Sequence, residues 1–342
     1  MDVGVNLAAL GAWMDGQGLG SGPLEKIERL AGGTQNILLR FTRSDRPYVL
    51  RHPPLHPRAN SNETMRREAR ILAALAGSEV PHPALIATCP DPSILGAAFY
   101  LMESVDGFNA SQGLPKRHAE DAAIRHCMGL AMVDAIAALS QVDFRAVGLA
   151  DFGKLDNWLE RQVGRWTSQL ASYGEMPGWT GPHSIPGVER VAKWLDDHRP
   201  QNLQPGIIHG DFHFANVLFR YDSGALAAVV DWELCTLGDP LLDLGWLVAT
   251  WPESDAPHAS DVAITPWDGF ATPDELVARY AARTERDMVH FDWFAVLACF
   301  KLGIILEGSH ARACAGKAPK EIGDRLHAHT VHLSERALRR IS

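Results

Sequence analysis

The chain has 342 residues, of which 46% are hydrophobic, and its 32 Lys and Arg against 41 Asp and Glu give a formal net charge of -9. This length and apolar content allow one large or two moderate cores, and the size favours two lobes. Since the balance is acidic and no long Lys/Arg run occurs, we expect neither nucleic acid nor an anionic membrane as a partner.

The N-terminal segment MDVGVNLAALGAWM lacks the basic start and the cleavage site of a secretion signal. It is better interpreted as an amphipathic helix that uses Leu7, Leu10, Trp13 and Met14. No stretch is expected to supply the 18 or so apolar residues of a membrane span. The five cysteines are scattered and form no CxxC pair, so neither a disulfide framework nor a zinc site is indicated and a reducing cytoplasm is the expected location.

The first hundred residues are predicted to be rich in β-structure. Segments 36–42 and 46–52 fit a hairpin around a polar turn at 43–45. Residues 63–76 fit a helix with an apolar stripe, and 96–107 fit a strand that ends at an Asp-Gly break. We therefore expect a boundary there, between an N-terminal lobe over 1–106 and a C-terminal lobe over 107–342.

The second lobe is predicted to be mostly helical. Apolar residues recur with helical spacing, and stretches rich in Gly and Pro at 174–187 and 252–273 are predicted to be loops. The predicted helices cover 119–141, 156–173, 187–198, 240–251, 273–287, 291–313 and 320–341.

A polar cluster interrupts this pattern in the apolar segment IIHGDFHFANVLF, residues 207–219. GIIHG, NVLFR and LAAVVDW each fit a short strand, and the turn residues YDSGA join the last two. In a symmetric hairpin Asn216 would lie opposite Asp231, with their Cβ atoms about 5 Å apart. An amide oxygen and a carboxylate so placed can bind Mg²⁺ at about 2.1 Å.

Asp211 precedes this hairpin on the adjoining loop. The pattern Asp-x4-Asn followed by a hairpin and Asp supplies what phosphoryl transfer requires. One carboxylate accepts the proton of the attacking hydroxyl, and two oxygen ligands hold the metal of the nucleotide.

HGDFHFANVLF followed by VVDWE resembles the catalytic loop and metal-binding segment of the aminoglycoside phosphotransferase-like kinases, which are related to choline and homoserine kinases and more distantly to protein kinases. The resemblance covers nearly the whole chain, and the segments RHPP and VPHPALIATCPDPSILGAAFYLMESVDG are most similar to kinase domains fused to some acyl-CoA dehydrogenases. The resemblance implies an α+β, protein-kinase-like bilobal fold with one main helix in the β-rich lobe and a mostly helical C-terminal lobe. It implies that the lobe over 1–106 binds the nucleotide and that the lobe over 107–342 is catalytic and binds the acceptor. It also implies ATP and Mg²⁺ as cofactors and a small hydroxyl-bearing acceptor, with no indication of the oligomeric state.

The same resemblance assigns roles in the polar segment. It implies that Asp211 is the catalytic base and that Asn216 and Asp231 coordinate magnesium. His213 falls where protein kinases keep a lysine near the transferring phosphoryl group, so it is expected to assist there. His209 is expected to pack behind the loop.

In the first lobe, LAGGTQNILLRF fits the phosphate-covering hairpin of the family, with Gly32, Gly33 and Thr34 at the nucleotide. The strand YVLR carries Arg51 where most of these kinases have lysine. An arginine can meet a phosphate and a carboxylate in a fork, and Glu68 on the following helix is its expected partner.

YLMESV resembles the hinge between the lobes, which leaves backbone groups of Glu103 and Val105 for adenine. Asp239 and Asp243 are expected to start a helix and to make structural hydrogen bonds. The histidines of HAHTVH have a spacing that mixes helix faces, so a solvated or partly packed surface is expected rather than a metal site.

Two alternatives to a kinase stay open. His209, Asp211 and His213 alternate along an extended segment and could serve a metal-dependent hydrolase. Arg51 in place of lysine fits a catalytically silent nucleotide-binding module. The acceptor is also open: residues 244–342 hold 13 acidic and 11 basic residues, which does not favour a polycationic aminoglycoside, and family analogy suggests a hydroxyacyl metabolite.

Overall fold

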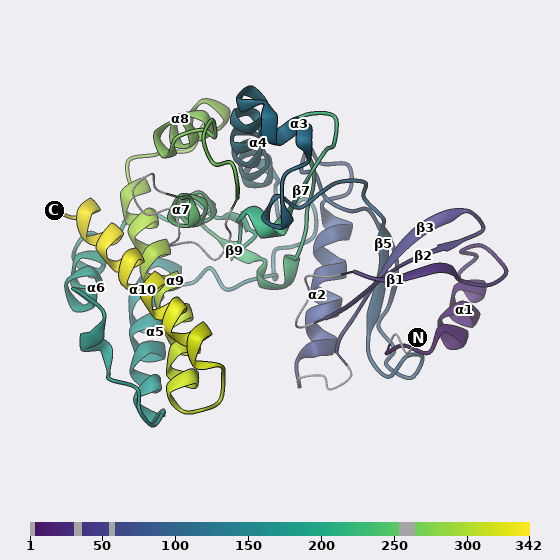
Figure 1. Ribbon diagram of the computed structural model, residues 1–342, viewed down its shortest axis with the longest axis horizontal. Helices are drawn as coiled ribbons and strands as arrows, with labels where there is room; N and C mark the ends of the chain where they lie inside the picture. The colour runs from purple at the N-terminus through teal and green to yellow at the C-terminus, as the bar shows by residue number, and fades with distance from the viewer. Residues whose placement is uncertain (1–3, 31–35, 55–58, 253–263) are drawn as a thin grey trace.

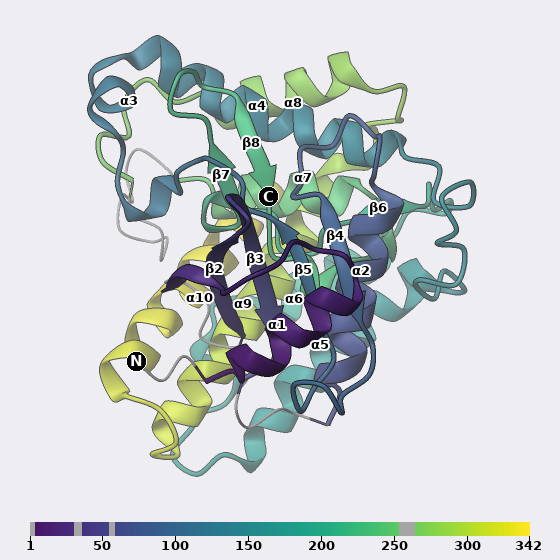
Figure 2. The same cartoon turned by 90° about the vertical axis from the view of Figure 1, so that its right-hand side faces the viewer.

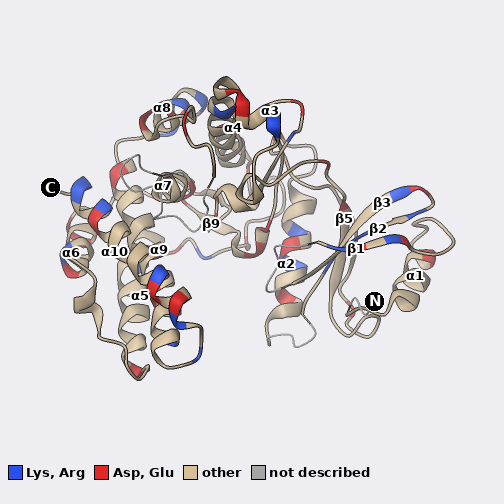
Figure 3. Ribbon diagram, in the orientation of Figure 1, with Lys and Arg blue, Asp and Glu red and all other residues tan. Residues whose placement is uncertain are grey.

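The computed structural model describes residues 4–30, 36–54, 59–252 and 264–342. They form a β-rich N-terminal lobe and a mostly helical C-terminal lobe that lie side by side (Figure 1). Basic and acidic residues are interspersed on the helices of both lobes (Figure 3). The predicted α+β bilobal class is confirmed, whereas the boundary at residue 106 stays a prediction.

The N-terminal lobe is one antiparallel five-stranded sheet with the strand order β1-β2-β3-β5-β4. The predicted hairpin is present, and its two-residue turn places Ser44 and Asp45 at φ 49° and 60°, which matches the twist of the flanking strands. The strands are β1 Glu25–Arg29, β2 Ile37–Arg43, β3 Arg46–His52, β4 Leu85–Cys89 and β5 Phe99–Glu103.

Each face of this sheet carries a helix. Helix α1 (Leu7–Gly16) covers one face, as Figure 2 shows, and its Leu10 and Met14 join a core with inward-facing residues of β2, β3 and β5. Helix α2 (Ser61–Ala74) covers the other face. Its Ile71 and Leu72 are buried in the cluster that also forms the core of the C-terminal lobe, so α2 belongs to both lobes by packing.

The C-terminal lobe is built around α9 (Phe291–Cys314), which is buried along most of its length and packs against α5, α6, α7 and α10. The other helices are α3 Lys116–Glu120, α4 Ala122–Gln141, α5 Trp158–Ser172, α6 Val188–Asp197, α7 Leu241–Thr250, α8 Pro273–Arg283 and α10 Lys320–Arg340. The helices predicted from periodicity are thus present with shifted ends.

Two small antiparallel ladders belong to the C-terminal lobe. Strand β6 (Gly206–Ile208) pairs with β9 (Thr236–Gly238), and β7 (Val217–Phe219) pairs with β8 (Leu226–Val229). The loop from β6 to β7 and the segment after β8 carry the polar residues singled out in the sequence.

The prediction that no segment is long and apolar enough to span a membrane was wrong. Helix α4 is long and apolar enough to cross a membrane by length and composition, although half of the relevant window is buried. Its charged side chains are engaged in the fold: Arg125 donates to Asp268, and Asp134 accepts from Arg279 and Arg283 of α8. These contacts fit a core helix, which passes the same test.

Candidate active site

The loop after β6 is fixed by the start of α7. The Asp243 carboxylate accepts hydrogen bonds from the backbone N–H groups of His209 (2.6 Å) and Gly210 (2.9 Å). Gly210 has a φ of +86°, and a Cβ there would lie 2.5 Å from the Leu234 carbonyl oxygen, so the position requires glycine. The structural roles expected of Asp243 and Asp239 are confirmed, since Asp239 accepts from Gln204 and Leu241.

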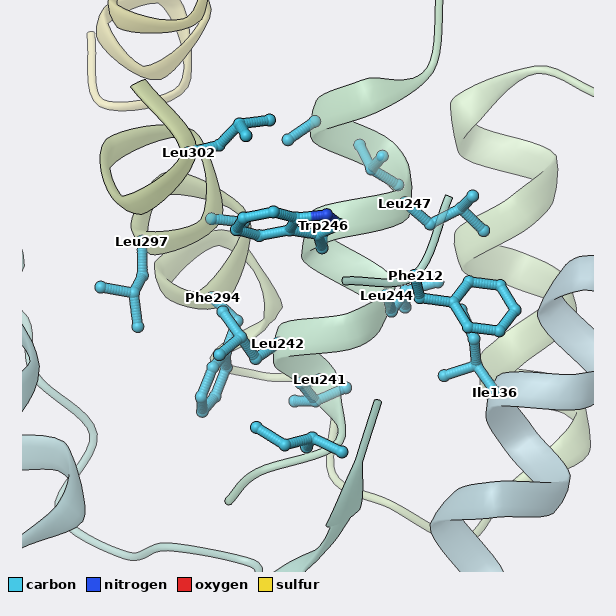
Figure 4. Close-up of a cluster of buried hydrophobic side chains, with 14 of the residues drawn as sticks. Ile136, Phe212, Leu241, Leu242, Leu244, Trp246, Leu247, Phe294, Leu297 and Leu302 are labelled. Carbon is cyan, nitrogen blue, oxygen red and sulfur yellow. The ribbon is translucent and has the colours of Figure 1, made fainter. Parts of the chain in front are cut away.

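Apolar packing anchors the same loop. Phe212 is buried and is directed toward Ile136 of α4 in Figure 4. His209 is fully buried, its Nε2 lies 3.0 Å from the Val230 carbonyl oxygen, and its Nδ1 accepts from the Asp211 N–H. Both ring nitrogens are therefore engaged within the protein. The hydrolase alternative loses one of its three metal ligands, and the expected packing role of His209 is confirmed.

Three predicted site residues meet at the end of this loop. The Asn216 amide donates to the Asp211 carboxylate (3.0 Å) and to the Asp211 carbonyl (2.9 Å). His213 Nε2 lies 3.3 Å from Asp211 Oδ1, while its Nδ1 accepts from the Ala215 N–H. Because Nδ1 is an acceptor, Nε2 carries the hydrogen and donates to Asp211.

This arrangement keeps Asp211 ionised. Burial by itself raises the pKa of a carboxyl group. Here the hydrogen bond from His213, the electrostatic effects of His213 and His209 and the hydrogen bond from the Asn216 amide outweigh burial and lower the pKa of Asp211 to about 2. At neutral pH the side chain is thus a carboxylate able to accept a proton, and 31% of it is exposed.

Arg51 links the two lobes. Its Nε lies 2.7 Å from Glu68 Oε2, and its Nη2 lies 2.7 Å from Asp231 Oδ1. The Tyr100 hydroxyl donates to Glu68 at 2.8 Å. Arg51 and Glu68 are 5% and 1% exposed, so the predicted pair is a buried ion pair rather than a surface one.

The pKa values reflect this burial. Desolvation raises the pKa of Glu68 to about 7 against the opposing effects of Arg51 and Tyr100. Desolvation acts to lower the pKa of Arg51, but Glu68 and Asp231 outweigh it and the pKa is raised. Arg51 is therefore a permanent cation at the base of the cleft.

The predicted hairpin register was wrong. Val217 pairs with Val229 and Leu218 with Ala228, so Asn216 lies opposite Val230 and accepts its N–H at 2.9 Å. A bulge next to Leu218 shifts the register. Asp231 then leaves the ladder with φ 64° and ψ 64°, a left-handed conformation that aspartate tolerates better than most residues.

Asn216 and Asp231 nevertheless line one cleft. It has a volume of about 740 Å³ and lies between the sheet of the first lobe and the β7–β8 ladder. This volume is within the range of small-molecule sites. Its walls include Leu30, Leu38, Val49, Arg51, Tyr100, Met102, Glu103, Val105, Leu114, Asn216, Leu218, Val230 and Asp231.

The two residues predicted to form the hinge border the cleft, but one of their backbone groups is already engaged. Glu103 and Val105 line the cleft, but the Glu103 N–H donates to the Ala84 carbonyl at 2.9 Å. That N–H is therefore unavailable to a ligand. Gly32, Gly33 and Thr34 lie outside the described residues.

The donor set suits a hard cation. The Asn216 amide nitrogen is turned toward Asp211, so the amide oxygen is left for another partner. Asp231 uses Oδ1 for Arg51, and its side chain is 40% exposed. Amide and carboxylate oxygens are ligands that Mg²⁺ accepts, so Asn216 and Asp231 fit a magnesium ion.

A second polar cluster lies between α9 and α10. Glu307, His310 and His327 bring possible ligand atoms within 4.8 Å of one another. His327 Nδ1 lies 2.8 Å from Glu307 Oε2, and the rings of His310 and His327 are stacked 4.5 Å apart at 25°. Stacked rings direct their lone pairs along nearly parallel planes rather than at one ion. We therefore interpret the cluster as hydrogen-bonded packing around a buried glutamate.

Some partners in the site were not predicted from the sequence. Tyr100 alternates along β5 onto the face that meets α2, a period-two signal that could have placed it beside Glu68. The contact of Arg51 with Asp231 joins residues 180 positions apart, and no local pattern reports it.

The bilobal fold, with its cleft and its Asp211–Asn216 loop, defines a protein of the protein-kinase-like class. A model of the phosphotransferase enzyme family (APH) matches residues 26–296. The chain belongs to this family.

Two curated relatives are dehydrogenases by name. The chain is 30% identical over 305 residues to mouse acyl-CoA dehydrogenase family member 10, and 29% identical over 305 residues to chicken acyl-CoA dehydrogenase family member 11. These matches cover 87% and 86% of this chain but only 27% and 38% of the relatives. The chain thus spans less than two fifths of the length of these two relatives.

Solved structures show the same fold. A candidate aminoglycoside phosphotransferase from Ralstonia eutropha is 29% identical, with a TM-score of 0.79 and coverage of 98% of this chain and 99% of that one. Aminoglycoside phosphotransferase APH(4)-Ia, in complex with AMP-PNP and hygromycin B, is 14% identical with a TM-score of 0.59, covering 94% and 97%. At that identity the second likeness shows the fold alone.

Proposed function

We propose that the protein is an ATP-dependent kinase that transfers the γ-phosphoryl group to a hydroxyl of a small acyl compound, with Mg²⁺ as cofactor. The observation that carries this proposal is the ionised Asp211, held by Asn216 and His213 next to a cleft that Arg51, Asn216 and Asp231 line. The names of the dehydrogenase relatives support a hydroxyacyl acceptor.

Each residue has a defined task in this reaction. The acceptor oxygen attacks the γ-phosphorus while the bond to the ADP oxygen breaks, and the hydroxyl proton passes to the Asp211 carboxylate. Asn216 and Asp231 would hold magnesium, which supplies positive charge to the phosphates. His213 donates to Asp211 and keeps the carboxylate oriented, and Arg51 places a fixed cation in the cleft.

The test is ADP formation with a panel of hydroxyl acceptors, comparing wild type with Asp211→Ala. We expect the variant to keep its thermal protection by Mg-ATP and to lose turnover by about 10²- to 10⁴-fold, the range for a missing general base. Unchanged turnover would remove Asp211 from this role. Nucleotide binding without ADP formation from any acceptor in the wild type would favour the silent module instead.

Asp231→Ala tests the metal separately. We expect loss of the protection that depends on magnesium and nucleotide together, with folding checked in the absence of nucleotide. Protection equal to that of wild type would contradict a metal role for Asp231.

A further inference from the structure

Lys301 lies against the catalytic loop without belonging to the nucleotide cleft. It is carried by α9, and its Nζ is 3.4 Å from the Gly210 carbonyl oxygen, one residue before Asp211. It is not among the residues that line the cleft between the lobes. The ammonium group therefore reaches the catalytic loop from the helical lobe.

Two tryptophans surround this ammonium. Its Nζ lies 4.6 Å from the ring centre of Trp246 and 5.7 Å from that of Trp166, within cation–π range. Trp246 lies between α7 and α9 in Figure 4. The two indoles are 3% and 8% exposed, and neither indole N–H has a hydrogen-bond partner in the described part of the chain. Unpaired buried donors require an explanation.

The charge of Lys301 is also poorly compensated. Asp243 and Asp211 are the carboxylates that act on it electrostatically, but Asp243 is engaged by two backbone N–H groups and Asp211 by Asn216 and His213. Within the described residues Lys301 makes no direct ion pair. Burial lowers the pKa of Lys301 to about 8, although both carboxylates oppose it. An ammonium has three donors, and one long contact to a carbonyl leaves it undersatisfied.

We propose that Lys301 binds an acyl oxygen of the acceptor, either the carboxylate of a hydroxy acid or the carbonyl of its thioester, while the acceptor hydroxyl reaches Asp211. This inference rests on the proposed kinase function and names the residue that binds the acyl group of the acceptor proposed there. A single cation beside two indole rings can bind one oxygen-bearing group, while the rings contact the hydrocarbon chain that carries it. It also repels a polycation, so aminoglycosides are poor acceptors.

A purely structural role makes a different prediction. If Lys301 only braces the loop through Gly210, its loss lowers turnover for every acceptor by the same factor. If it binds an acyl oxygen, the loss is confined to acceptors that carry one. The comparison therefore needs pairs of acceptors that differ only in the acyl group.

The experiment measures kcat and KM from ADP formation with short hydroxy carboxylic acids, their coenzyme A thioesters and the matched diols. Wild type is compared with Lys301→Met, with Lys301→Gln as a second neutral variant, and with Lys301→Arg, which keeps a cation. Lys193→Met is the surface control, because Lys193 is exposed and its ion pair with Asp197 lies at the surface. Thermal protection by Mg-ATP verifies folding and the nucleotide site in each variant.

We expect wild type to prefer acyl acceptors over diols, and the better of acid and thioester identifies the source of the oxygen. In Lys301→Met, kcat/KM for acyl acceptors should fall by about 10- to 100-fold, the effect of losing a hydrogen bond from a charged group, with the diol value unchanged. Lys301→Arg should recover part of the loss.

Equal losses for acyl acceptors and diols would overturn the inference, as would a wild type that prefers diols or aminoglycosides. A wild type that binds Mg-ATP and phosphorylates other alcohols but no acyl compound overturns it and leaves the kinase assignment standing. Failure to bind Mg-ATP at all overturns both.

Discussion

Arg51 is the residue at which this chain departs from the usual lysine of its family, and the structure shows what the guanidinium does there. Its Nε faces Glu68 and its Nη2 faces Asp231, so a single planar group joins a helix of the first lobe to the predicted metal ligand of the second. A lysine ammonium is a point charge and cannot present two separate edges. Arginine in place of lysine is therefore compatible with a functional site, and it gives little support to a catalytically silent module.

We expect Arg51→Met to lower the free energy of unfolding by about 3–5 kcal/mol, which is the cost of removing one partner from a buried ion pair. Arg51→Lys should lose less. Urea denaturation at neutral pH measures both. The matched control is Arg40→Met, whose ion pair with Glu28 is about half exposed and should matter little. If Arg51→Met cost no more than Arg40→Met, the buried pair would not stabilise the fold.

His213 controls the proton affinity of Asp211. With a pKa of about 2, Asp211 stays ionised throughout the accessible pH range. Because this pKa is lower than the ordinary value of 3.8, ionised Asp211 stabilises the folded protein above pH 3.8, and this stabilisation is lost as the pH falls through about 2. In His213→Ala the largest lowering effects disappear while burial still raises the pKa. We therefore expect kcat/KM of His213→Ala to decrease at acid pH, within the measurable range, because Asp211 becomes protonated there. Superimposable profiles of variant and wild type would contradict this role.

At the scale of elements, the helices and strands that depend on local sequence were predicted well. The β2–β3 hairpin, α2 and the long helices follow from apolar periodicity and turn residues. Strand β1 was missed because it is an exposed edge strand, EKIER, without apolar alternation, and β9 was missed because it has only three residues. The β7–β8 register was missed because a bulge is set by packing between segments.

The contacts of the site were predicted only in part. The Arg51–Glu68 contact was expected and is present. The contact of Asn216 with Asp211 was not expected, because Asn216 was predicted to lie beside Asp231. The link from Arg51 to Asp231 was not expected either, since only the closure of the two lobes brings them together. The same applies to Lys301, which no motif singled out.

Through Asp243, helix α7 holds the loop that carries the proposed base Asp211, and this connection can be tested. Asp243→Ala leaves the N–H groups of His209 and Gly210 without their acceptor, so we expect a loss of about 2–6 kcal/mol at 1–3 kcal/mol for each unpaired donor. Amide hydrogen exchange at these two residues should accelerate and turnover should fall. Asp292→Ala, at an exposed ion pair with Arg340, is the control. Unchanged exchange in Asp243→Ala would show that the loop is held by packing alone.

At the scale of the whole molecule, the two lobes share a core through α2. Besides its apolar face in the larger cluster, α2 sends Arg67 to the carbonyl oxygens of Phe152 (2.9 Å) and Cys235 (3.3 Å), and Arg70 pairs with Asp151. The Arg67 guanidinium also lies 4.1 Å from the centre of the Phe152 ring. The two lobes that border the cleft are therefore packed together through α2.

This shared core predicts a single cooperative unfolding transition. Nine of the ten tryptophans belong to the helical lobe, and Trp13 alone reports on the sheet. The difference in fluorescence between wild type and Trp13→Phe follows the first lobe, while the remaining signal follows the second. We expect coincident urea midpoints that Mg-ATP raises together, since a ligand bound between the lobes stabilises both. In Arg67→Ala the contacts of α2 with the second lobe weaken, so the midpoint of the first lobe should fall below that of the second. Separate midpoints already in wild type would mean that the lobes fold independently and that the α2 contacts do not couple them.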